Sequence, residues 1–449
     1  MLQHSIQYFD DSSRYYQALA SLKLPILLNS QGAGRYDIIV AEPFMQLITH
    51  GEQTTITEHN AKDRLSSEPP LQLIEEMLSK RKPTQPGVLF CGGAVGLLGY
   101  DLGRLTLKKE YACPDMVVGI FDWALVIDHT DHTTHLYSAG MHPSTALLWP
   151  ELIERLSDFP PLAPQEFQVS NPSSNLPSAL YQSCFERIKS YISQGDCYQV
   201  NLAQRLRFDF TGSSFAAYQN LRKSRAQFAA FIKGDGFEIL SFSPEQFLQI
   251  DYPWAQTKPI KGTRPRSLDP IRDHFLREDL VNSPKDRAEN LMIVDLLRND
   301  FSKVCEPFSV KVPAIFEIES LPAVHHLVST VSGKLKPGLS PIALLQACFP
   351  GGSITGAPKI RAMEIIDEVE PNQRGPYCGT IFYIGWDWHM DSNIAIRSLL
   401  REGGSLYCWA GGGIVHDSEL KAEYQETQDK VSLILQMLEV GFPEPTKLG

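Results

Sequence analysis

The sequence predicts an α+β protein built on large, mainly antiparallel β-sheets. Many short apolar runs have strand-like patterning, and they do not alternate with helices in the steady β-α-β order of a doubly wound parallel sheet. Hydrophobic residues make up 43% and charged residues 21% of the 449 positions, which is the composition of a globular protein with an extensive core.

The first part of the chain, residues 1–160, is predicted to be rich in strands. These are the runs PILLNS, YDIIVAEP, VLFCGGAVGLLGYDLGR, MVVGIFDWALVIDH and THLYSAG, the last two separated by a polar DHTTH turn. Pro, Ser and Asn then become frequent. Because prolines remove amide donors and Ser and Asn favour turns, we predict a linker over residues 161–178.

The second region, residues 179–449, begins with a predicted amphipathic helix, Ala179–Gln194, which Gly195 ends. Its apolar residues recur at helical spacing and form one stripe, made of Tyr181, Phe185, Ile188 and Ile192. The run CYQVNLAQRLRFDF then alternates like a strand. FEILSFSPEQFLQI predicts two further strands around a turn at Ser243-Pro244.

Two more helices are predicted at Arg287–Asn299 and Lys359–Glu368, the second preceded by the glycine-rich loop PGGSITGAP. The stretch from residue 377 to residue 415 returns to strand patterning, with turn signals at Asp391-Ser392 and Gly403-Gly404, and a closing helix follows it.

Charge and cysteine usage exclude several classes of function. The formal net charge is −11 and there is no long basic run, so we expect no nucleic-acid partner. The eight cysteines are scattered without a Cys-x-x-Cys pair, which suits a reducing cytoplasm. No export signal or run of about 18 apolar residues is present, so we expect a cytoplasmic protein without a membrane partner.

Two acidic pairs are candidates for a metal site. Asp286 and Glu289, and likewise Glu423 and Glu426, are spaced i,i+3 on predicted helices, so each pair shares one helix face. Carboxylates from two helices can hold a hard cation such as Mg²⁺. The alternative is that both pairs lie on solvated helix surfaces.

Other polar residues are individually ambiguous. Gly411–Gly413 offer consecutive amides that could receive a carboxylate, or they form a tight turn. Lys261, in PIKGTRPR, could be an ordinary solvated amine. His325 and His326 could be hydrogen-bonded core or surface histidines.

A set of motifs, found in a consistent order, favours the functional interpretation of these residues. SPEQF, PIKGTRPR, DRAENLMIVDLLRND, HHLVST, FPGGSITGAPKIRAMEIIDE, YCGT, IAIRS, AGGGIV and EYQET together resemble the chorismate-utilising enzymes throughout residues 180–435. The N-terminal runs LLNS, RYDIIVAEP and GGAVGLLGYDLGR extend the resemblance to nearly the whole chain. It implies a layered, sandwich-like core of two large antiparallel sheets with helices outside.

The resemblance also implies a site. Glu289 and Glu426 would bind Mg²⁺ directly, with Asp286 and Glu423 holding its waters. The carboxylates of chorismate would be received by Tyr377, Arg397 and the amides of Gly411, Gly412 and Gly413, with Thr263 and His326 as further substrate-binding residues. Trp409 stands where several relatives carry a polar or basic residue.

Two positions distinguish the reactions of the family. Members that add water at C2 have a basic lysine at the position of Gln199, and an amide cannot activate water in that way. Anthranilate-forming members have alanine at the position of Lys261. The resemblance therefore implies amination at C4, in which the Lys261 amine attacks C2 while Glu245 protonates the departing C4 hydroxyl, and ammonia then displaces the lysine.

Two alternatives remain open: amination at C2 with loss of pyruvate, and a non-catalytic subunit that binds chorismate or tryptophan. The resemblance leaves no room for a glutaminase domain of about 200 residues. It therefore implies that ammonia comes from a separate glutamine amidotransferase subunit, bound stably or transiently. LLNS, ending at Ser30, resembles the segment that lines a tryptophan pocket in anthranilate-forming relatives.

Overall fold

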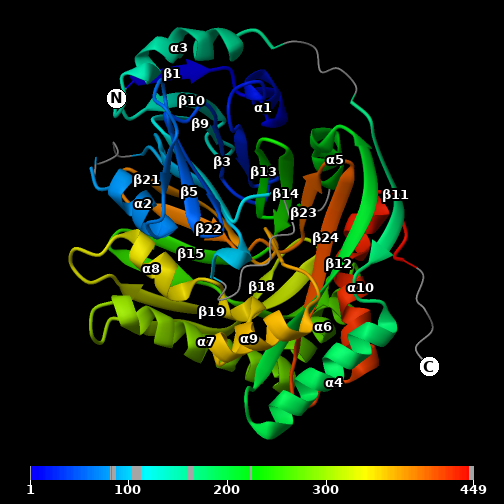
Figure 1. Cartoon of the computed structure of the whole chain (residues 1–449). Coiled ribbons are helices and arrows are strands. Elements are labelled where there is room, and N and C mark those ends of the chain that lie inside the picture. Colours follow the sequence, from blue (N-terminus) through cyan, green and yellow to red (C-terminus); the bar gives the residue numbers. More distant parts are fainter. Residues whose placement is uncertain are drawn as a thin grey trace.

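In the part of the chain that the structure describes, two twelve-stranded sheets form the centre of the protein, and their strands pair antiparallel (Figure 1). The computed structural model describes residues 2–80, 82, 87–103, 113–159, 165–222 and 225–443. The predicted fold class, an α+β protein with two large antiparallel sheets, is confirmed.

The first sheet has the N-terminal strand at one edge and a strand from the middle of the sequence at the other edge. Its spatial order is β1 (Leu2–Ile6), β10 (Thr133–Ser138), β9 (Trp123–Asp128), β3 (Tyr36–Val40), β2 (Ile26–Asn29), β13 (Phe228–Lys233), β14 (Phe237–Ser243), β23 (Ser398–Glu402), β24 (Ser405–Ile414), β12 (Gln199–Gly212) and β11 (Phe167–Ser174), while β20 (Gly356–Ala357) pairs with β12.

The second sheet also joins early and late parts of the chain. Its order is β17 (Ile260–Pro265), β19 (Val324–Lys334), β16 (Trp254–Thr257), β15 (Gln246–Asp251), β22 (Met390–Asn393), β21 (Thr380–Gly385), β7 (Gly93–Leu98), β8 (Met116–Phe121), β4 (Met45–His50), β5 (Gln53–Glu58) and β6 (Arg64–Ser66), while β18 (Lys311–Ser320) pairs with β19.

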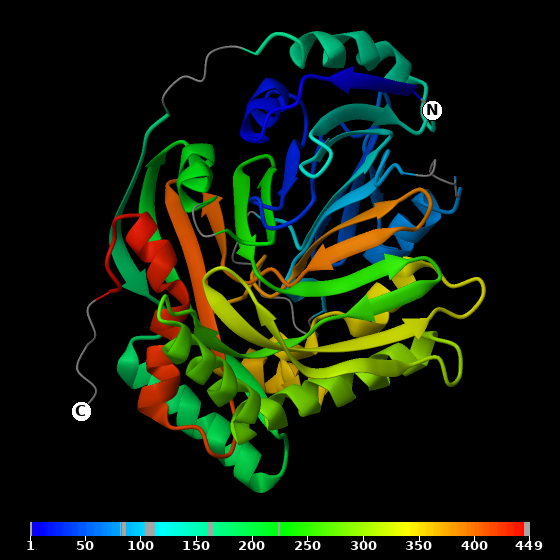
Figure 2. The ribbon, with the colours of Figure 1, turned by 180° about the vertical axis from the view of Figure 1, so that it is seen from behind.

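The helices lie around the sheets, as Figures 1 and 2 show. They are α1 (Ser13–Leu19), α2 (Pro70–Met77), α3 (Ser144–Arg155), α4 (Ser178–Gln194), α5 (Ser214–Leu221), α6 (Pro270–Asn282), α7 (Pro284–Val304), α8 (Pro341–Cys348), α9 (Lys359–Val369) and α10 (Leu420–Met437). Short 3-10 turns occur at η1 (Tyr100–Gly103) and η3 (Gly352–Ile354).

The main core fills the space between the two sheets, where apolar residues of both are buried, such as Val40 and Ile239 from the first and Leu97 and Leu248 from the second. Burial of each such side chain contributes about 1.5–3 kcal/mol. A second cluster packs α1, α3, α5 and α10 on the outer face of the first sheet.

Helix α4 is the predicted amphipathic helix, one residue longer at its start. All four residues of its predicted apolar stripe are buried against α9 and β12. It ends at Gly195, which caps it with φ of 82°. The predicted helices at Arg287–Asn299 and Lys359–Glu368 likewise lie within α7 and α9.

The predicted linker differs from the structure over Phe167–Ser174, which form the edge strand β11 paired with β12. A local pattern rich in Ser and Asn does not reveal this pairing, because the partner strand lies further along the chain. Residues 161–164 of that prediction lie outside the described residues. The division into regions at 160 and 178 stays a prediction, and both sheets contain strands from each side of it.

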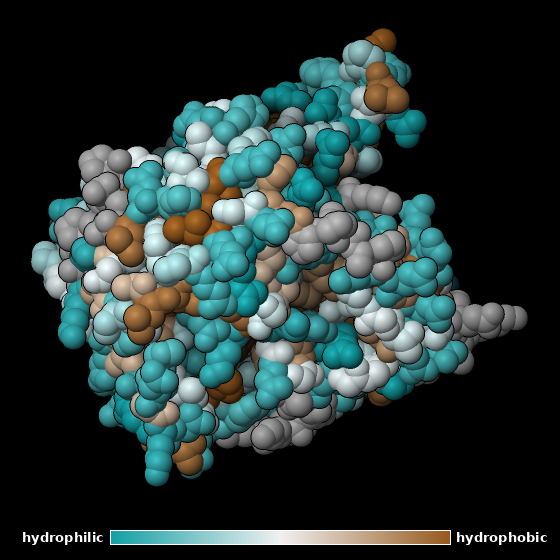
Figure 3. Space-filling model, turned by 90° about the horizontal axis from the view of Figure 1, so that it is seen from above, coloured by the Kyte–Doolittle hydropathy of each residue, from teal (hydrophilic) through white to brown (hydrophobic). Residues whose placement is uncertain are grey.

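The hydropathy of the surface and the state of the cysteines are ordinary. In the view from above, hydrophobic residues are scattered among hydrophilic ones, which is ordinary for a protein surface (Figure 3). All eight cysteines are buried and unbridged. Among the described helices, none is both long and apolar enough to cross a membrane.

Candidate active site

A cavity of about 680 Å³ gathers most of the residues that the sequence singled out. They come from β17, α7, β19, β24 and α10, from the segment between α9 and β21, and from two connections that pass from one sheet to the other. The predicted residues that line it are Glu245, Lys261, Thr263, Asp286, Glu289, His326, Tyr377, Arg397, Gly411, Gly413, Glu423 and Glu426. Gly412 does not line it, and Ser30 lies in a different cavity.

The two connections explain why Glu245 and Arg397 meet. Glu245 lies between β14 of the first sheet and β15 of the second, and Arg397 lies between β22 of the second sheet and β23 of the first. The connections are hydrogen-bonded to each other, since the amide of Ile394 donates to the carbonyl of Glu245 at 3.1 Å. The predicted turn at Ser243-Pro244 is therefore a crossing between sheets.

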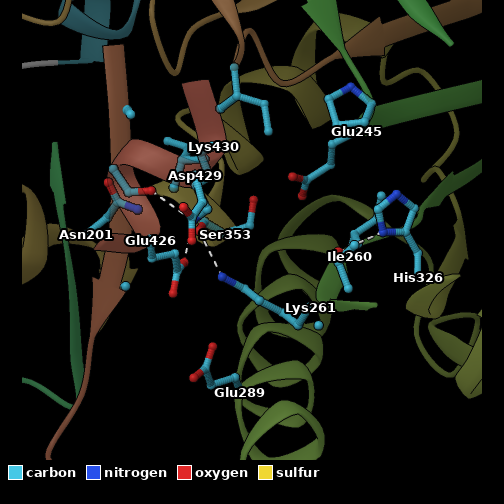
Figure 4. A pocket seen from close by; sticks show the side chains of 18 of the residues that line it. Asn201, Glu245, Ile260, Lys261, Glu289, His326, Ser353, Glu426, Asp429 and Lys430 are labelled. Atoms are coloured by element: carbon cyan, nitrogen blue, oxygen red, sulfur yellow. Dashed lines mark hydrogen bonds and ion pairs between the residues drawn. The ribbon is translucent and has the colours of Figure 1, made fainter. Parts of the chain in front are cut away.

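Lys261 points into the cavity from β17, with Glu245, Glu289 and Glu426 around it (Figure 4). Its ammonium donates a hydrogen bond to the Ser353 carbonyl at 3.2 Å. Burial lowers the pKa of Lys261, and the negative charges of Glu289 and Glu245 oppose that shift. The alternative of an ordinary solvated amine is thus wrong.

Glu245 is 7% exposed, and burial raises its pKa. The positive charge of Lys261 acts most strongly in the opposite direction, and the polar groups of Ser353 and Ile260 also lower the pKa of Glu245. Both shifts therefore favour a neutral amine beside a protonated carboxyl, because each buried group is easier to accommodate without its charge.

The approach of α7 to β17 requires a glycine next to Lys261. Gly262 has φ of +89°, and a Cβ there would lie 2.8 Å from both the Asp286 Cγ and the Leu280 Cδ1. Any other residue would be strained at this φ and would displace the Asp286 and Leu280 side chains that pack against the strand. Helix α7 then begins with the Ser283 hydroxyl accepting from the Asp286 amide, and Asp286 lies in its first turn.

The four acidic residues of α7 and α10 are each paired with a cation or a hydroxyl. Asp286 contacts the Arg264 guanidinium at 3.1 Å, and Glu426 contacts the Lys430 ammonium at 2.6 Å. Glu423 accepts from the Ser418 hydroxyl at 2.6 Å. They face a substrate-sized cavity, so the alternative of two solvated helix surfaces is wrong.

Lys285 joins the two helices electrostatically. Its ammonium lies 3.9 Å from a carboxylate oxygen of Glu289 on α7 and 4.0 Å from one of Glu423 on α10. Burial raises the pKa of Glu289 and of Glu423, and Glu426 adds to both shifts by like-charge repulsion. Burial is also the largest single influence on Glu426, but the charge and hydrogen bond of Lys430, together with the charges of Lys285 and Lys261, outweigh it and lower the pKa of Glu426.

This donor set fits a hard divalent cation held by few direct ligands. Within the ranges described, no group of three or more His, Cys, Asp or Glu side chains is close enough to surround a metal ion. Mg²⁺ is commonly bound through one or two carboxylates and several waters, so Glu289 and Glu426 from facing helices suffice. A cation placed there would also relieve the repulsion among the carboxylates.

The glycines at 411–413 lie inside β24, so the alternative of a tight turn is wrong. Two of them leave room for a neighbouring side chain to lie against the strand. A Cβ on Gly412 would lie 3.1 Å from a Glu423 carboxylate oxygen, and a Cβ on Gly413 would lie 2.8 Å from the Gln199 amide nitrogen. The pairing of β24 with β23 ends at Cys408, so this segment pairs with β12 on one side.

Gln199 lies behind this segment and is fully buried. Neither atom of its amide has a hydrogen-bond partner among the described residues, and it does not line the cavity.

Arg397 and Tyr377 also line the cavity. The Arg397 guanidinium has no ion pair or side-chain hydrogen bond within the described ranges, so it is available to an anion. Burial lowers its pKa and Glu245 opposes this, yet an arginine stays charged near neutral pH. The Tyr377 ring stacks on Trp409 at 6.0 Å between centroids and 5° between planes.

Thr263 and His326 form a pair, with 2.9 Å between the Thr263 hydroxyl and Nδ1 of His326. Burial, reinforced by Arg397, lowers the pKa of His326 to about 4, so the ring is neutral near pH 7. The neighbouring His325 points elsewhere and contacts Ser320 and Asp273.

Several polar lining residues escaped the sequence reasoning, among them Asn201, Lys285, Ser353 and Lys430. Lys430 is one helical turn after Glu426, and Lys285 is one turn before Glu289, so the i,i+4 spacing of opposite charges was the available signal. Ser353 carried no local signal beyond its glycine-rich loop.

Below the cavity, a buried ion pair ties three segments together. Arg374 makes two hydrogen bonds to Glu370, at 2.6 and 2.9 Å, and donates to the carbonyls of Ile354 and Asn201. The two side chains are 1% and 3% exposed. This pair fixes the loop before α9 against β12.

Replacing Glu370 with alanine should cost about 3–5 kcal/mol in the free energy of unfolding, because it leaves a buried guanidinium without its counter-charge. Urea unfolding measures this loss. The control is Glu364→Ala, whose ion pair with Arg361 is far more exposed, at 30% for Arg361 and 40% for Glu364, and should contribute about 0–1 kcal/mol. Equal losses in the two variants would contradict the role of the buried pair.

Ser30 lines a separate cavity of about 300 Å³ with residues of β2, β13 and β22. Its hydroxyl lies 2.9 Å from a carboxylate oxygen of Asp37 and 3.1 Å from the Gly34 carbonyl. Tryptophan binding at this place stays a prediction.

The sequence and the fold have well-characterised counterparts. The profile of the chorismate binding enzymes matches residues 24–436. Aminodeoxychorismate synthase component 1 of Klebsiella aerogenes is 47% identical, covering 96% of this chain and 97% of the relative. The protein of that name from Escherichia coli is 45% identical, covering 96% of each chain.

Among solved structures, anthranilate synthase component I from Streptococcus pneumoniae superposes with a TM-score of 0.77 at 29% identity, covering 89% of this chain and 92% of that one.

Proposed function

The chain belongs to the chorismate binding enzymes, as its motifs predicted, and we propose that it aminates chorismate at C4 to give 4-amino-4-deoxychorismate, the precursor of p-aminobenzoate and folate. The observation that carries this proposal is that Lys261 and Glu245 line the same cavity and interact electrostatically there. The names of its relatives that are 45% and 47% identical over nearly the whole chain support the same activity.

In the first step, the neutral Lys261 amine attacks C2 of the ring. The two conjugated double bonds each shift by one position, the C4–O bond breaks, and the hydroxyl leaves as water with the proton of Glu245. The Glu245 carboxylate formed in this way can accept the proton that the lysine nitrogen loses, so charge and protons balance.

In the second step, ammonia attacks C4, the double bonds return, and the C2–N bond to Lys261 breaks. As that bond breaks, Glu245 gives its proton to the lysine nitrogen, which takes the electron pair and leaves as the neutral Lys261 amine. The nitrogen now on C4 passes its extra proton to the Glu245 carboxylate, so the step balances. Because C2 is occupied by the lysine until ammonia has bonded to C4, the nitrogen is directed to C4.

The charged residues of the cavity suit a substrate with two carboxylates. We assign one to Arg397 and Tyr377 and the region of Gly411–Gly413, where a guanidinium and backbone donors face the cavity. Mg²⁺ held by Glu289 and Glu426, with Asp286 and Glu423 around its waters, would supply the positive charge that anchors the ring carboxylate.

Product identification tests the proposal. Incubation with chorismate, Mg²⁺ and ammonium should give an aminated product that forms p-aminobenzoate only after addition of a lyase. Fluorescent o-aminobenzoate would instead show amination at C2 with loss of pyruvate, and absence of turnover would favour a non-catalytic binding subunit.

The nitrogen source gives a further prediction. We propose that a glutamine amidotransferase subunit supplies ammonia, since the curated relatives are named as component 1. The purified chain should turn over chorismate with ammonium, and it should be nearly inactive with glutamine until that subunit is added. Product formation measured with each nitrogen source checks this, and efficient use of glutamine by the chain alone would refute it.

A further inference from the structure

Helix α6 carries large apolar side chains that face solvent. Ile271 and Phe275 are 82% and 67% exposed, and Leu268, just before the helix, is fully exposed. Ile271 and Phe275 are four residues apart, so they lie on the same face of the helix. Together with Leu268 they form the α6 stripe, which exposed polar residues such as Arg272 and His274 flank. An apolar centre with a polar rim is the usual composition of a protein–protein interface.

The α6 stripe lies close to the rim of the active-site cavity. Helix α6 ends at Asn282, and the next residue, Ser283, caps the start of α7 and lines the cavity. Phe275 comes about two helical turns before Ser283, which corresponds to about 12 Å along the helix axis. A protein bound to the stripe can therefore reach the rim of the cavity.

Salt bridges also join α6 to the strand that carries Lys261. Arg264, on the same strand β17, lies 2.6 Å from a carboxylate oxygen of Asp279 on α6. Arg266, just after the strand, lies 2.9 Å from a carboxylate oxygen of Asp273 on α6. A protein that binds α6 would thus contact a helix that is tied to the catalytic strand.

We propose that the α6 stripe is the docking surface for the glutamine amidotransferase subunit that supplies ammonia to the cavity. This inference rests on the proposed function. Phe275 and Ile271 would insert into an apolar pocket of the partner, where large apolar side chains carry much of the binding energy of an interface.

The choice of partner follows from the nitrogen that the cavity consumes. Ammonia released into water near neutral pH takes up a proton and loses its nucleophilic lone pair, so it has to pass to C4 without leaving the complex. A subunit that produces ammonia must therefore bind beside the cavity. The curated relatives are named as component 1, which implies a second component, and the α6 stripe is an apolar surface in the required position.

The test uses Ile271→Glu and Phe275→Glu in the full chain, together with the purified glutamine amidotransferase subunit from the same organism. Each variant should weaken the complex by about 10-fold or more in calorimetry, because a charge would be buried in the centre of the contact. At limiting partner, turnover of chorismate with glutamine should fall in parallel. Turnover with ammonium should match that of the wild type, since neither side chain lines the cavity.

Leu147→Glu is the matched control, because Leu147 is 82% exposed on α3 and should not affect partner binding. All three side chains are largely exposed, so the variants should melt as the wild type does. Unchanged affinity in both α6 variants, or an equal loss in the control, would overturn the docking surface.

Two other results would assign the stripe differently. If the wild-type chain alone is a dimer by light scattering and the α6 variants are monomers, the stripe joins two copies of the chain and the docking role is wrong. A wild-type chain that binds the amidotransferase through the stripe but forms no C4 product would overturn the proposed function and leave the docking surface in place.

Discussion

Replacing Glu289 or Glu426 with alanine is expected to lower Mg²⁺-supported turnover of chorismate by about 10²-fold or more, because several kcal/mol of charge stabilisation depend on the bound cation. The two carboxylates come from helices far apart in the sequence and face the same cavity as Lys261. Neither helix needs them for packing, so the fold should persist. Initial rates against Mg²⁺ concentration and thermal melting measure the two effects.

A matched control lies on the same helix as Glu289. Asp295 is 61% exposed and pairs only with Arg298 among the described residues, so Asp295→Ala removes a carboxylate of α7 without touching the cavity. Its turnover and its affinity for Mg²⁺ by calorimetry should match those of the wild type. If the Glu289 and Glu426 variants kept the normal rate and Mg²⁺ dependence, the metal assignment would be wrong.

Local patterns predicted the elements well where one face of an element is buried. The stripe of α4 is an example, because helical spacing alone decides which residues reach the core. The turn that local patterns predicted at Asp391-Ser392 is wrong, because these residues lie inside β22. The turn precedes them, where Trp388 has φ of 72° and Asp387 accepts a hydrogen bond from the His389 amide.

Local sequence patterns did not predict which distant strands pair with each other. Strand β7 pairs with β21 and β2 pairs with β13, so strands of the N-terminal region are built into the same sheets as the catalytic strands. Nothing in either segment specifies its partner, since any apolar strand of similar length can satisfy the same backbone donors and acceptors. Only the resemblance to a family predicted the two-layered arrangement.

For the cavity, the resemblance identified the catalytic and acidic residues, while their counter-charges came from the structure. Lys285 bridges two helices, and a contact between α7 and α10 cannot be read from the spacing within either one. The directions of the pKa shifts of Lys261 and Glu245 likewise depend on burial, which the motifs do not report.

Those shifts give the pH dependence of the first step. An exposed lysine has a pKa of about 10.4, and burial lowers that of Lys261, so its neutral form becomes available at lower pH. Burial raises the pKa of Glu245, so it remains protonated to higher pH than an exposed glutamate. Adduct formation needs Lys261 without its proton and Glu245 with one, so its rate should fall at both acidic and alkaline pH; the two shifts bring the pKa values toward each other and so enlarge the share of that reactive form.

The decisive expectation is a covalent bond to Lys261. With chorismate and Mg²⁺ but no ammonia, the chain should gain the mass of chorismate less one water, and peptide mapping should place it on Lys261. Lys261→Ala should lose the adduct and slow C4 amination by about 10²-fold or more, the scale expected when a positioned catalytic group is removed. Lys258→Ala is the control, since that lysine precedes the same strand and pairs with Glu319 at the surface.

Lys261→Arg separates covalent catalysis from a purely electrostatic role. Arginine keeps the positive charge near Glu245 and Glu289 but stays protonated, so it cannot attack C2. If the lysine acts as a nucleophile, the arginine variant should be as slow as the alanine variant and form no adduct. An arginine variant with a near-normal rate, or an adduct trapped on another residue, would show that Lys261 serves as a local charge and that selectivity for C4 arises from how the ring is held against ammonia.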